Sequence, residues 1–192
     1  MSQKVKYFIK VVLCGEAAVG KTSLRRKWMG KGFSSSYLPT LGADFAVYST
    51  EYNNQSVEVQ IWDLAGQPTF ELLRKRFFIG VTAALLVFDL TREDTLLKLS
   101  KWILELQESN PGQKIPVLFI GNKNDLKDKR TVNSSLIEEF VKKIENNPQY
   151  NVEIIGSIET SAKTGEHVDE AFKTIINHAL ESQFLKNNVN AR

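Results

Sequence analysis

Residues 15–23, with the sequence GEAAVGKTS, combine glycine, lysine and hydroxyl side chains at a spacing that suits the binding of nucleotide phosphates. Gly15 and Gly20 permit backbone angles and close approaches that a side chain would block, so the loop N–H groups can point inward at an anion. Lys21 would neutralise the β- and γ-phosphates, and the Thr22 hydroxyl would bind Mg²⁺. The residues predicted to contact the phosphates are Gly15, Glu16, Ala17, Ala18, Val19, Gly20, Lys21, Thr22 and Ser23.

The segment WDLAGQ, residues 62–67, carries groups that could act on the same phosphates. Asp63 ends a predicted strand and could hold Mg²⁺ through a water molecule. Gly66 could bring its N–H close to the γ-phosphate. Gln67 has both a donor and an acceptor, which suits the orientation of an attacking water molecule. Alone, this pattern would indicate an ordinary turn, but after a phosphate loop it predicts Gln67, Gly66 and Lys21 as catalytic groups.

The segment NKND, residues 122–125, would select the base. The carboxylate of Asp125 can accept two hydrogen bonds at once, from the ring N1–H and from the exocyclic amino group of guanine. Adenine offers no such pair of donors on that edge. Asn122 could brace the loop, and Lys123 could lay its alkyl stem over the base. An isolated Asn- and Asp-rich segment is more often a solvated turn, so the prediction depends on the other motifs.

The segment ETSAK, residues 159–163, follows the next predicted strand. The N–H of Ala162 could donate to guanine O6 and would reject the amino group of adenine. Together with NKND, this segment predicts a guanine nucleotide. The residues of the segment that are predicted to contact the base are Ser161, Ala162 and Lys163.

These motifs need elements that bring the ends of several strands together. Short apolar runs with little alternation predict strands that are covered on both faces. Residues 43–52 and 55–63 alternate like an antiparallel pair that turns at the two asparagines between them. The predicted strands cover residues 7–14, 43–52, 55–63, 82–90, 115–122 and 150–159, and the predicted helices cover residues 21–29, 91–107, 135–144 and 168–180.

The element order β, α, β, β, α, β, α, β, α, β, α predicts a three-layer α/β domain. Its six-stranded sheet is expected to be mostly parallel, with one antiparallel edge strand and about five flanking helices. Ligands of such sheets bind at the carboxyl ends of the strands, and every motif above follows a predicted strand. We expect one domain over residues 1–181 and a flexible polar tail over residues 182–192.

Composition excludes several other classes of protein. The chain has 192 residues, of which 42% are hydrophobic and 24% charged, which is typical of one soluble globular domain. A net charge of +3 gives no case for a nucleic-acid partner. The single cysteine, Cys14, excludes an intramolecular disulfide and is typical of a cytoplasmic protein. No apolar run approaches the roughly 20 residues that a transmembrane helix needs.

With all of these motifs in order, the sequence resembles the Ras superfamily of small GTPases over about residues 5–180. It is most similar to the Rab branch. TLGADF, residues 40–45, resembles switch I of Rabs, and IWDLAGQ, residues 61–67, resembles the start of switch II, with Leu64 where Rabs usually carry Thr. The resemblance implies the P-loop NTPase fold of a small G-domain, GTP or GDP with Mg²⁺ as ligands, and GTPase activity.

The resemblance implies roles for further positions. Thr40 resembles the switch I threonine that binds Mg²⁺ and touches the γ-phosphate, so the implied metal ligands are Thr22, Thr40 and, through water, Asp63. Phe33 falls where the family stacks an aromatic ring on guanine, and Tyr37 falls where a ring closes over the phosphates. The aromatic triad through which Rabs contact effectors is matched by Phe45, Trp62 and Phe78.

The implied function is a two-state molecular switch of intracellular trafficking. GTP and Mg²⁺ would hold both switches through the γ-phosphate, by Thr40 on one side and Gly66 on the other, and hydrolysis would release them. No arginine is evident that could act in cis, so hydrolysis is expected to be slow until a GTPase-activating protein supplies one. An exchange factor and effectors are the other implied partners.

Three features depart from the family pattern. Ala17 puts a methyl group where Ras proteins have Gly, and we expect it to slow hydrolysis by crowding the γ-phosphate and Gln67. Pro68 removes an N–H and biases Gln67 away from the right-handed helical region. The tail has no cysteine for the prenylation that Rabs normally carry, so peripheral membrane association is expected only if the native C-terminus is lipidated.

Two alternatives follow from the same residues. An ATP-dependent kinase or motor would share the phosphate loop, but NKND and ETSAK speak against it. A GTP-binding interaction module with negligible hydrolysis is the second alternative. Gln67 favours catalysis, whereas Ala17 and Pro68 keep this alternative open.

Overall fold

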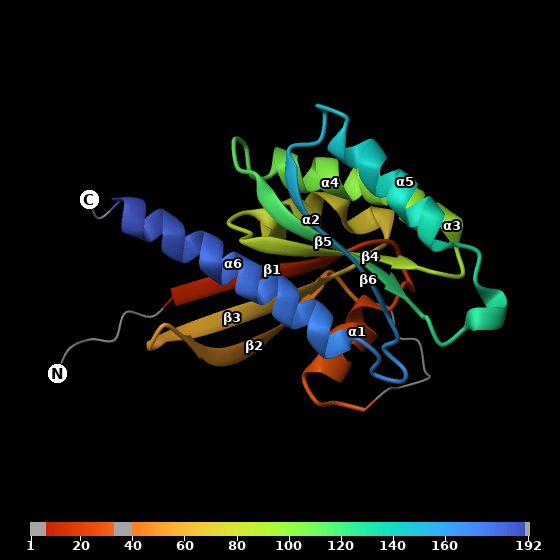
Figure 1. The fold of residues 1–192 in the computed structure, drawn as a ribbon, viewed down its shortest axis with the longest axis horizontal. Helices are drawn as coiled ribbons and strands as arrows, with labels where there is room; N and C mark the ends of the chain where they lie inside the picture. The colour runs from red at the N-terminus through yellow and green to blue at the C-terminus, as the bar shows by residue number, and fades with distance from the viewer. Residues whose placement is uncertain (1–6, 33–39, 191–192) are drawn as a thin grey trace.

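Six strands form one sheet in the order β2-β3-β1-β4-β5-β6, and helices cover both of its faces (Figure 1). The computed structural model describes residues 7–32 and 40–190. Short 3₁₀ turns lie at Pro68–Phe70 and Lys127–Lys129. The strands are β1 Tyr7–Cys14, β2 Ala43–Tyr52, β3 Gln55–Leu64, β4 Ala83–Asp89, β5 Ile115–Asn122 and β6 Val152–Thr160, and the helices are α1 Lys21–Trp28, α2 Glu71–Phe78, α3 Glu93–Leu97, α4 Leu99–Glu108, α5 Ser134–Glu145 and α6 Val168–Asn190.

The sheet confirms the predicted fold class. All neighbouring strands run parallel except β2, which pairs antiparallel with β3 at one edge. Asn53 and Asn54 form the turn between these two strands, with φ angles of 50° and 61°, which asparagine tolerates better than most residues. Every residue of β4 and β5 is buried, as their uninterrupted apolar runs predict.

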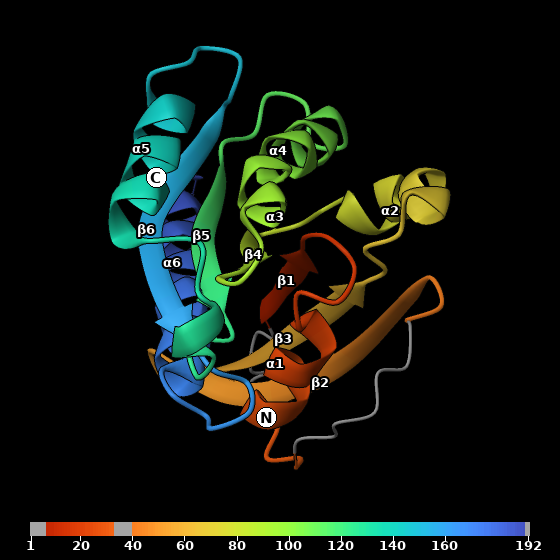
Figure 2. The ribbon, with the colours of Figure 1, turned by 90° about the vertical axis from the view of Figure 1, so that its right-hand side faces the viewer.

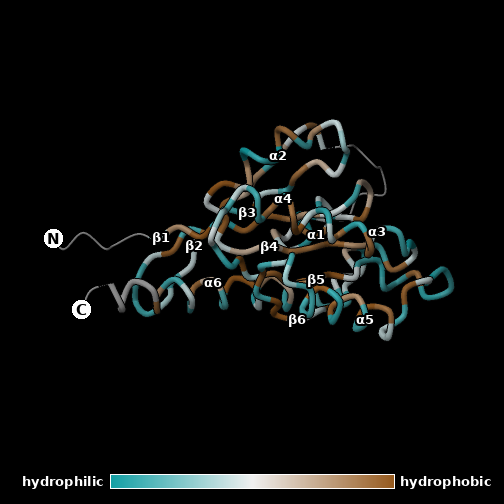
Figure 3. The backbone as a smooth tube through the Cα atoms, turned by 90° about the horizontal axis from the view of Figure 1, so that it is seen from above, coloured by the Kyte–Doolittle hydropathy of each residue, from teal (hydrophilic) through white to brown (hydrophobic). Residues whose placement is uncertain are grey.

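Two apolar cores lie on opposite faces of the sheet (Figure 2). Helices α2, α3, α4 and α5 pack on one face, where Trp102 and Phe140 are buried. Helices α1 and α6 pack on the other face, where Leu24 and Phe172 are buried. Hydrophobic residues therefore gather along the central strands, which are brown in Figure 3. This arrangement leaves the carboxyl ends of the parallel strands free to carry loops.

The single helix predicted over residues 91–107 is two helices in the structure. Helix α3 ends at Leu97 and α4 begins at Leu99, with Lys98 between them. Thr95 fixes the start of α3, because its hydroxyl donates to the Arg92 carbonyl at 2.7 Å and accepts from the Asp89 N–H at 2.9 Å. The start of α3 therefore depends on local polar contacts of Thr95 that hydrophobic periodicity does not detect.

Helix α6 continues through Asn190, beyond the predicted end at residue 180 and into the segment predicted as a flexible polar tail. Phe184 explains the difference. Its ring lies 4.6 Å from that of Tyr7 on β1 and 4.9 Å from that of Tyr52 on β2. The segment predicted as a polar tail is therefore helical up to Asn190. Among the helices of the described residues, none combines the length and the apolar character that crossing a membrane requires.

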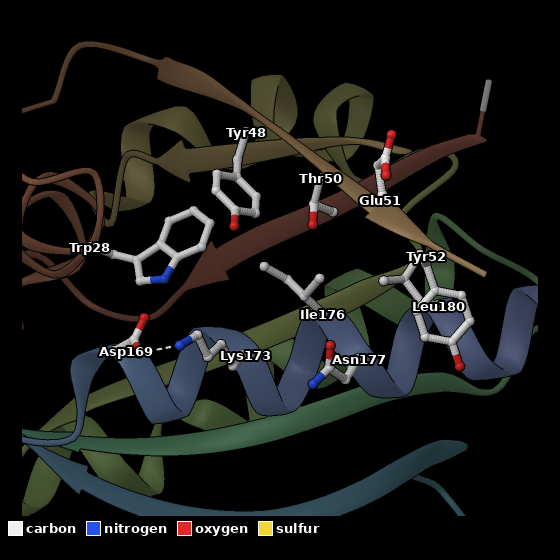
Figure 4. A pocket seen from close by; sticks show the side chains of 10 residues that line it. All are labelled: Trp28, Tyr48, Thr50, Glu51, Tyr52, Asp169, Lys173, Ile176, Asn177 and Leu180. Carbon is white, nitrogen blue, oxygen red and sulfur yellow. Dashed lines mark ion pairs between the residues drawn. The ribbon is translucent and has the colours of Figure 1, made fainter. Parts of the chain in front are cut away.

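A cavity of about 310 Å³ lies between β2 and α6 (Figure 4). The Trp28 ring closes one end of it, stacking on Phe172 at 4.7 Å and meeting Tyr48 edge-on at 4.7 Å. Asp169 and Lys173 form an ion pair of 2.6 Å on its rim. None of the residues that line this cavity belongs to the predicted nucleotide site, so the two regions are separate.

Candidate nucleotide-binding site

Of the predicted site residues that the structure describes, all but Thr40 lie at the ends of β1, β3, β5 and β6 or in the segments that directly follow them, and Thr40 lies shortly before β2. The phosphate loop joins β1 to α1, and its two glycines hold it close to its neighbours. Gly15 has a φ of 137°, and a Cβ there would lie 2.0 Å from the Val87 carbonyl oxygen. Gly20 has a φ of 102°, and a Cβ there would lie 2.2 Å from Nδ2 of Asn122. Only glycine fits either position.

Helix α1 begins at Lys21, directly after the loop. Gly20 is its N-cap residue, and no side chain in the described part of the chain caps it. The N–H groups of the first turn are therefore available to an anion, and the helix dipole favours negative charge at this end.

The ammonium group of Lys21 is buried at the loop. Its Nζ donates to the carbonyl oxygens of Gly15 at 2.6 Å and Glu16 at 2.9 Å. Burial lowers the pKa of Lys21 to about 8, and the nearby Asp63 carboxylate opposes this shift. A buried cation that is held by two neutral carbonyls gains most from a ligand that carries negative charge.

Two hydroxyls and one carboxylate from three separate segments meet beside Lys21. The oxygens of Thr22 and Thr40 are 3.0 Å apart, Thr22 donates to Asp63, and Thr40 lies 3.4 Å from the same carboxylate oxygen. Asp63 is fully buried, which raises the pKa of its carboxyl group. Its second oxygen has no hydrogen-bond partner among the described residues. An all-oxygen group with one unpaired carboxylate oxygen fits Mg²⁺.

The loop after β3 lies against the phosphate loop. A Cβ on Gly66 would be 2.4 Å from the backbone nitrogen of Ala17, so only glycine allows this approach. Gln67 has φ −76° and ψ 140°, in the extended region. This conformation confirms the predicted effect of Pro68, which begins the following 3₁₀ turn.

Asn122 connects the base segment to both neighbouring loops. Its Nδ2 donates to the Val19 carbonyl in the phosphate loop at 2.8 Å. Its Oδ1 accepts from the Ala162 N–H at 3.1 Å and from the Thr160 hydroxyl at 3.3 Å. The structure therefore gives the Ala162 N–H a protein acceptor, where guanine O6 was predicted. Any base contact of this amide would have to share its hydrogen.

Asp125 is the acceptor predicted for guanine. The Ser161 hydroxyl donates to its Oδ1 at 2.7 Å, and the Nζ of Lys163 lies 3.8 Å from its Oδ2. The NKND and ETSAK segments are thus in contact, as their predicted common role requires. Ser161 holds one carboxylate oxygen in place, while the other lies near the ammonium group of Lys163.

The sequence motifs did not identify two polar residues that lie at this edge, Asp89 and Arg92. Asp89 ends β4 and accepts from the Nζ of Lys123 at 2.6 Å and from the Nε of Arg92 at 3.1 Å. Arg92 also donates to the Ala17 carbonyl at 3.0 Å. An arginine thus contacts the phosphate loop from within the chain, although none was evident in the sequence. The available signal was a charged residue at the end of an otherwise apolar strand.

The predicted aromatic triad needs one correction. Phe45 and Trp62 stack with ring centroids 4.9 Å apart, and Phe45 is 53% exposed. The third ring beside Trp62 is Phe77, at 5.2 Å. Phe78, which was predicted for this position, is fully buried in the core beneath α2 and is not accessible to a partner. Phe33 and Tyr37 lie outside the described residues.

Comparison with known proteins agrees with this geometry. The sequence matches the Ras family over residues 10–181. It is 35% identical over 185 residues to Ras-related protein Rab7 of Drosophila melanogaster, covering 94% of this chain and 84% of that protein. It is 34% identical over 175 residues to Ras-related protein RABA4a of Arabidopsis thaliana, covering 91% and 73%. The chain therefore belongs to the Ras family of small GTPases, in the Rab branch.

Proposed function

We propose that this GTPase binds GTP and GDP with Mg²⁺, hydrolyses GTP slowly, and presents the GTP form to effectors through the segments at residues 40–45 and 61–67. The observation that carries the proposal is the convergence of Thr22, Thr40 and Asp63 beside the buried ammonium of Lys21. Bound Mg²⁺ would supply positive charge to the β- and γ-phosphates.

The residues of the chain divide the work of hydrolysis in this proposal. Lys21 exchanges its two carbonyl contacts for phosphate oxygens and stabilises the charge that develops on them. The Gly66 N–H donates to the γ-phosphate. Gln67 orients the attacking water molecule, and Thr40 contributes its hydroxyl to the metal site. Loss of the γ-phosphate removes the ligand of Gly66 and Thr40, and both segments relax.

The proposed ligands of the base are Asp125, Lys123 and the 161–163 segment. Asp125 is held by Ser161 and can accept from the two guanine donors. Effectors would bind the aromatic surface of Phe45, Trp62 and Phe77, which adjoins both segments. An exchange factor and a GTPase-activating protein are expected to act on the slow release of GDP and the slow hydrolysis.

Gln67→Leu is expected to slow single-turnover hydrolysis by at least about tenfold, because an orienting donor and acceptor is lost. Phosphate release from GTP-loaded protein measures the rate. Gln113→Leu is the matched control, since Gln113 is exposed on a loop away from the site. A wild-type protein that retains GTP without hydrolysing it would favour the alternative of a binding module with negligible hydrolysis.

Ala17→Gly is expected to speed hydrolysis severalfold, because Gly66 packs against the Ala17 backbone and the methyl group adds to this crowding. The same single-turnover assay measures the effect. The rate of GDP release from the variant serves as the control, since the contacts of Lys21 and Asp125 are unchanged. An unaltered hydrolysis rate would show that the Ala17 methyl group does not limit the reaction.

A further inference from the structure

We propose that Arg74 is a positioning residue for GTP hydrolysis, which orients the Gly66 N–H and fixes the backbone of Gln67. The inference rests on the proposed function, because it assumes that Gly66 and Gln67 act on the γ-phosphate and on water. In this proposal Arg74 itself touches neither the γ-phosphate nor the attacking water molecule. It acts through the two carbonyl groups on either side of Gly66.

Arg74 is a buried cation with a buried partner. It lies on α2 and is 2% exposed, and Glu105 on α4 is 4% exposed. The guanidinium donates through Nε and Nη2 to both carboxylate oxygens, at 3.1 to 3.2 Å. Its Cζ also lies 4.3 Å from the centre of the Trp102 ring. The guanidinium plane is therefore fixed by α4.

The remaining nitrogen, Nη1, contacts the loop that carries the proposed catalytic groups. It donates to the carbonyl oxygen of Gln67 at 2.8 Å and to that of Ala65 at 3.2 Å. These two carbonyls flank Gly66. All five N–H donors of an arginine have fixed directions, so a guanidinium held by α4 also determines where these carbonyls point.

Peptide planarity passes this constraint to Gly66. The Ala65 carbonyl and the Gly66 N–H belong to one trans peptide unit, in which they point in opposite directions. Holding the carbonyl oxygen toward α2 therefore turns the N–H away from α2. The Gln67 carbonyl belongs to the next unit but one, where Pro68 has no N–H. Its contact restrains the ψ angle of Gln67, and hence the direction in which the Cα–Cβ bond leaves the backbone relative to this carbonyl.

Helix packing alone does not account for this pair. Two exposed ion pairs, Lys75–Glu108 at 2.9 Å and Lys101–Glu71 at 2.8 Å, already join α2 to α4. Burying an ion pair costs desolvation, and apolar side chains of similar volume usually stabilise such a position as well or better. The buried Arg74–Glu105 pair is therefore best explained by the hydrogen bonds that its guanidinium donates to the carbonyls of Ala65 and Gln67.

The deciding experiment compares the double variant Arg74→Leu/Glu105→Leu with the wild type. The variant replaces the pair by apolar volume and leaves both carbonyls without their donor. We expect the variant to fold, with a melting temperature at or somewhat below that of the wild type because two carbonyls lose their donor, and with unchanged GDP release, while single-turnover hydrolysis slows at least about tenfold. Lys75→Gln/Glu108→Gln is the matched control, which removes an exposed pair between the same helices and is expected to change none of these values.

Wild-type hydrolysis in a stable double variant would overturn the inference and leave Arg74 a structural residue. If the double variant does not fold, Arg74→Lys decides, because a lysine can pair with Glu105 but cannot also hold two carbonyls in fixed directions. Slower hydrolysis with unchanged GDP release then supports the inference, and unchanged hydrolysis overturns it. Two measurements separate the proposals: a wild type that does not hydrolyse GTP would refute the proposed function, whereas slow wild-type hydrolysis that Arg74→Lys leaves unchanged would refute only the role of Arg74.

Discussion

Asp125→Asn is expected to lower the affinity for GDP by about 10³-fold, a loss of about 4 kcal/mol, because a carboxylate that accepts from two guanine donors is lost. The variant places an amide nitrogen opposite the exocyclic amino group of guanine, so two donors meet. Oδ1 can remain with Ser161, whose hydroxyl donates to it at 2.7 Å. The loop is therefore expected to keep its conformation while the base contact is broken.

Xanthine nucleotides test the chemistry of this contact. Xanthine carries a carbonyl oxygen where guanine has its amino group, and the new amide can donate to that oxygen. We expect the variant to bind XDP more tightly than GDP, as measured by competition with a fluorescent nucleotide. Asp128→Asn is the matched control, an exposed aspartate near the same loop, and should bind GDP like the wild type. Equal loss of GDP and XDP affinity in Asp125→Asn would contradict a direct contact with the base.

Lys21→Met is expected to lower the affinity for GDP and GTP by about 10³-fold, through loss of charge-assisted contacts with the phosphates. Without nucleotide, the same substitution is not expected to lower the stability of the protein. Burial lowers the pKa of Lys21 to about 8, so the folded chain bears a cost for holding this ammonium. Methionine has a similar length without the charge, and the free variant should melt no lower than the free wild type.

Titration calorimetry and thermal melting without nucleotide measure these two effects separately. Lys31→Met, an exposed site just after α1, is the matched control and is expected to change neither value. A free Lys21→Met variant that melts well below the wild type would contradict the idea that this cation is retained for its ligand.

Much of the fold could be predicted because its signals are local. The strands β1 and β5 have the predicted bounds, since each is a continuous apolar run that ends at a motif. The turn at Asn53 and Asn54 depends only on two residues that tolerate positive φ. The meeting of Thr22 and Asp63 follows from the rule that parallel strands present their carboxyl ends at one edge, whereas the place of Thr40 beside them was implied only by the family resemblance.

What the sequence did not predict depends on tertiary contacts. Adjacent residues of a helix differ by about 100° in direction, so Phe77 and Phe78 cannot be told apart before the buried face of α2 is known. Phe184 extends α6 by packing against Tyr7. Because Tyr7 lies far away in the sequence, this contact could not be foreseen. Arg74 and Glu105 are 31 residues apart and belong to no motif. Such pairs become visible only when two helices are placed side by side.

The contacts from Lys123 through Asp89 and Arg92 to the Ala17 carbonyl have a consequence for nucleotide release. They join the segments that we propose to hold the two ends of the nucleotide, and a bound nucleotide would join the same segments on the other side. Protein and ligand then form a closed ring, in which each half restrains the other. Opening the ring at the base or at the phosphates would loosen the opposite end as well. A regulatory partner that displaces one end of GDP would thereby weaken the whole site.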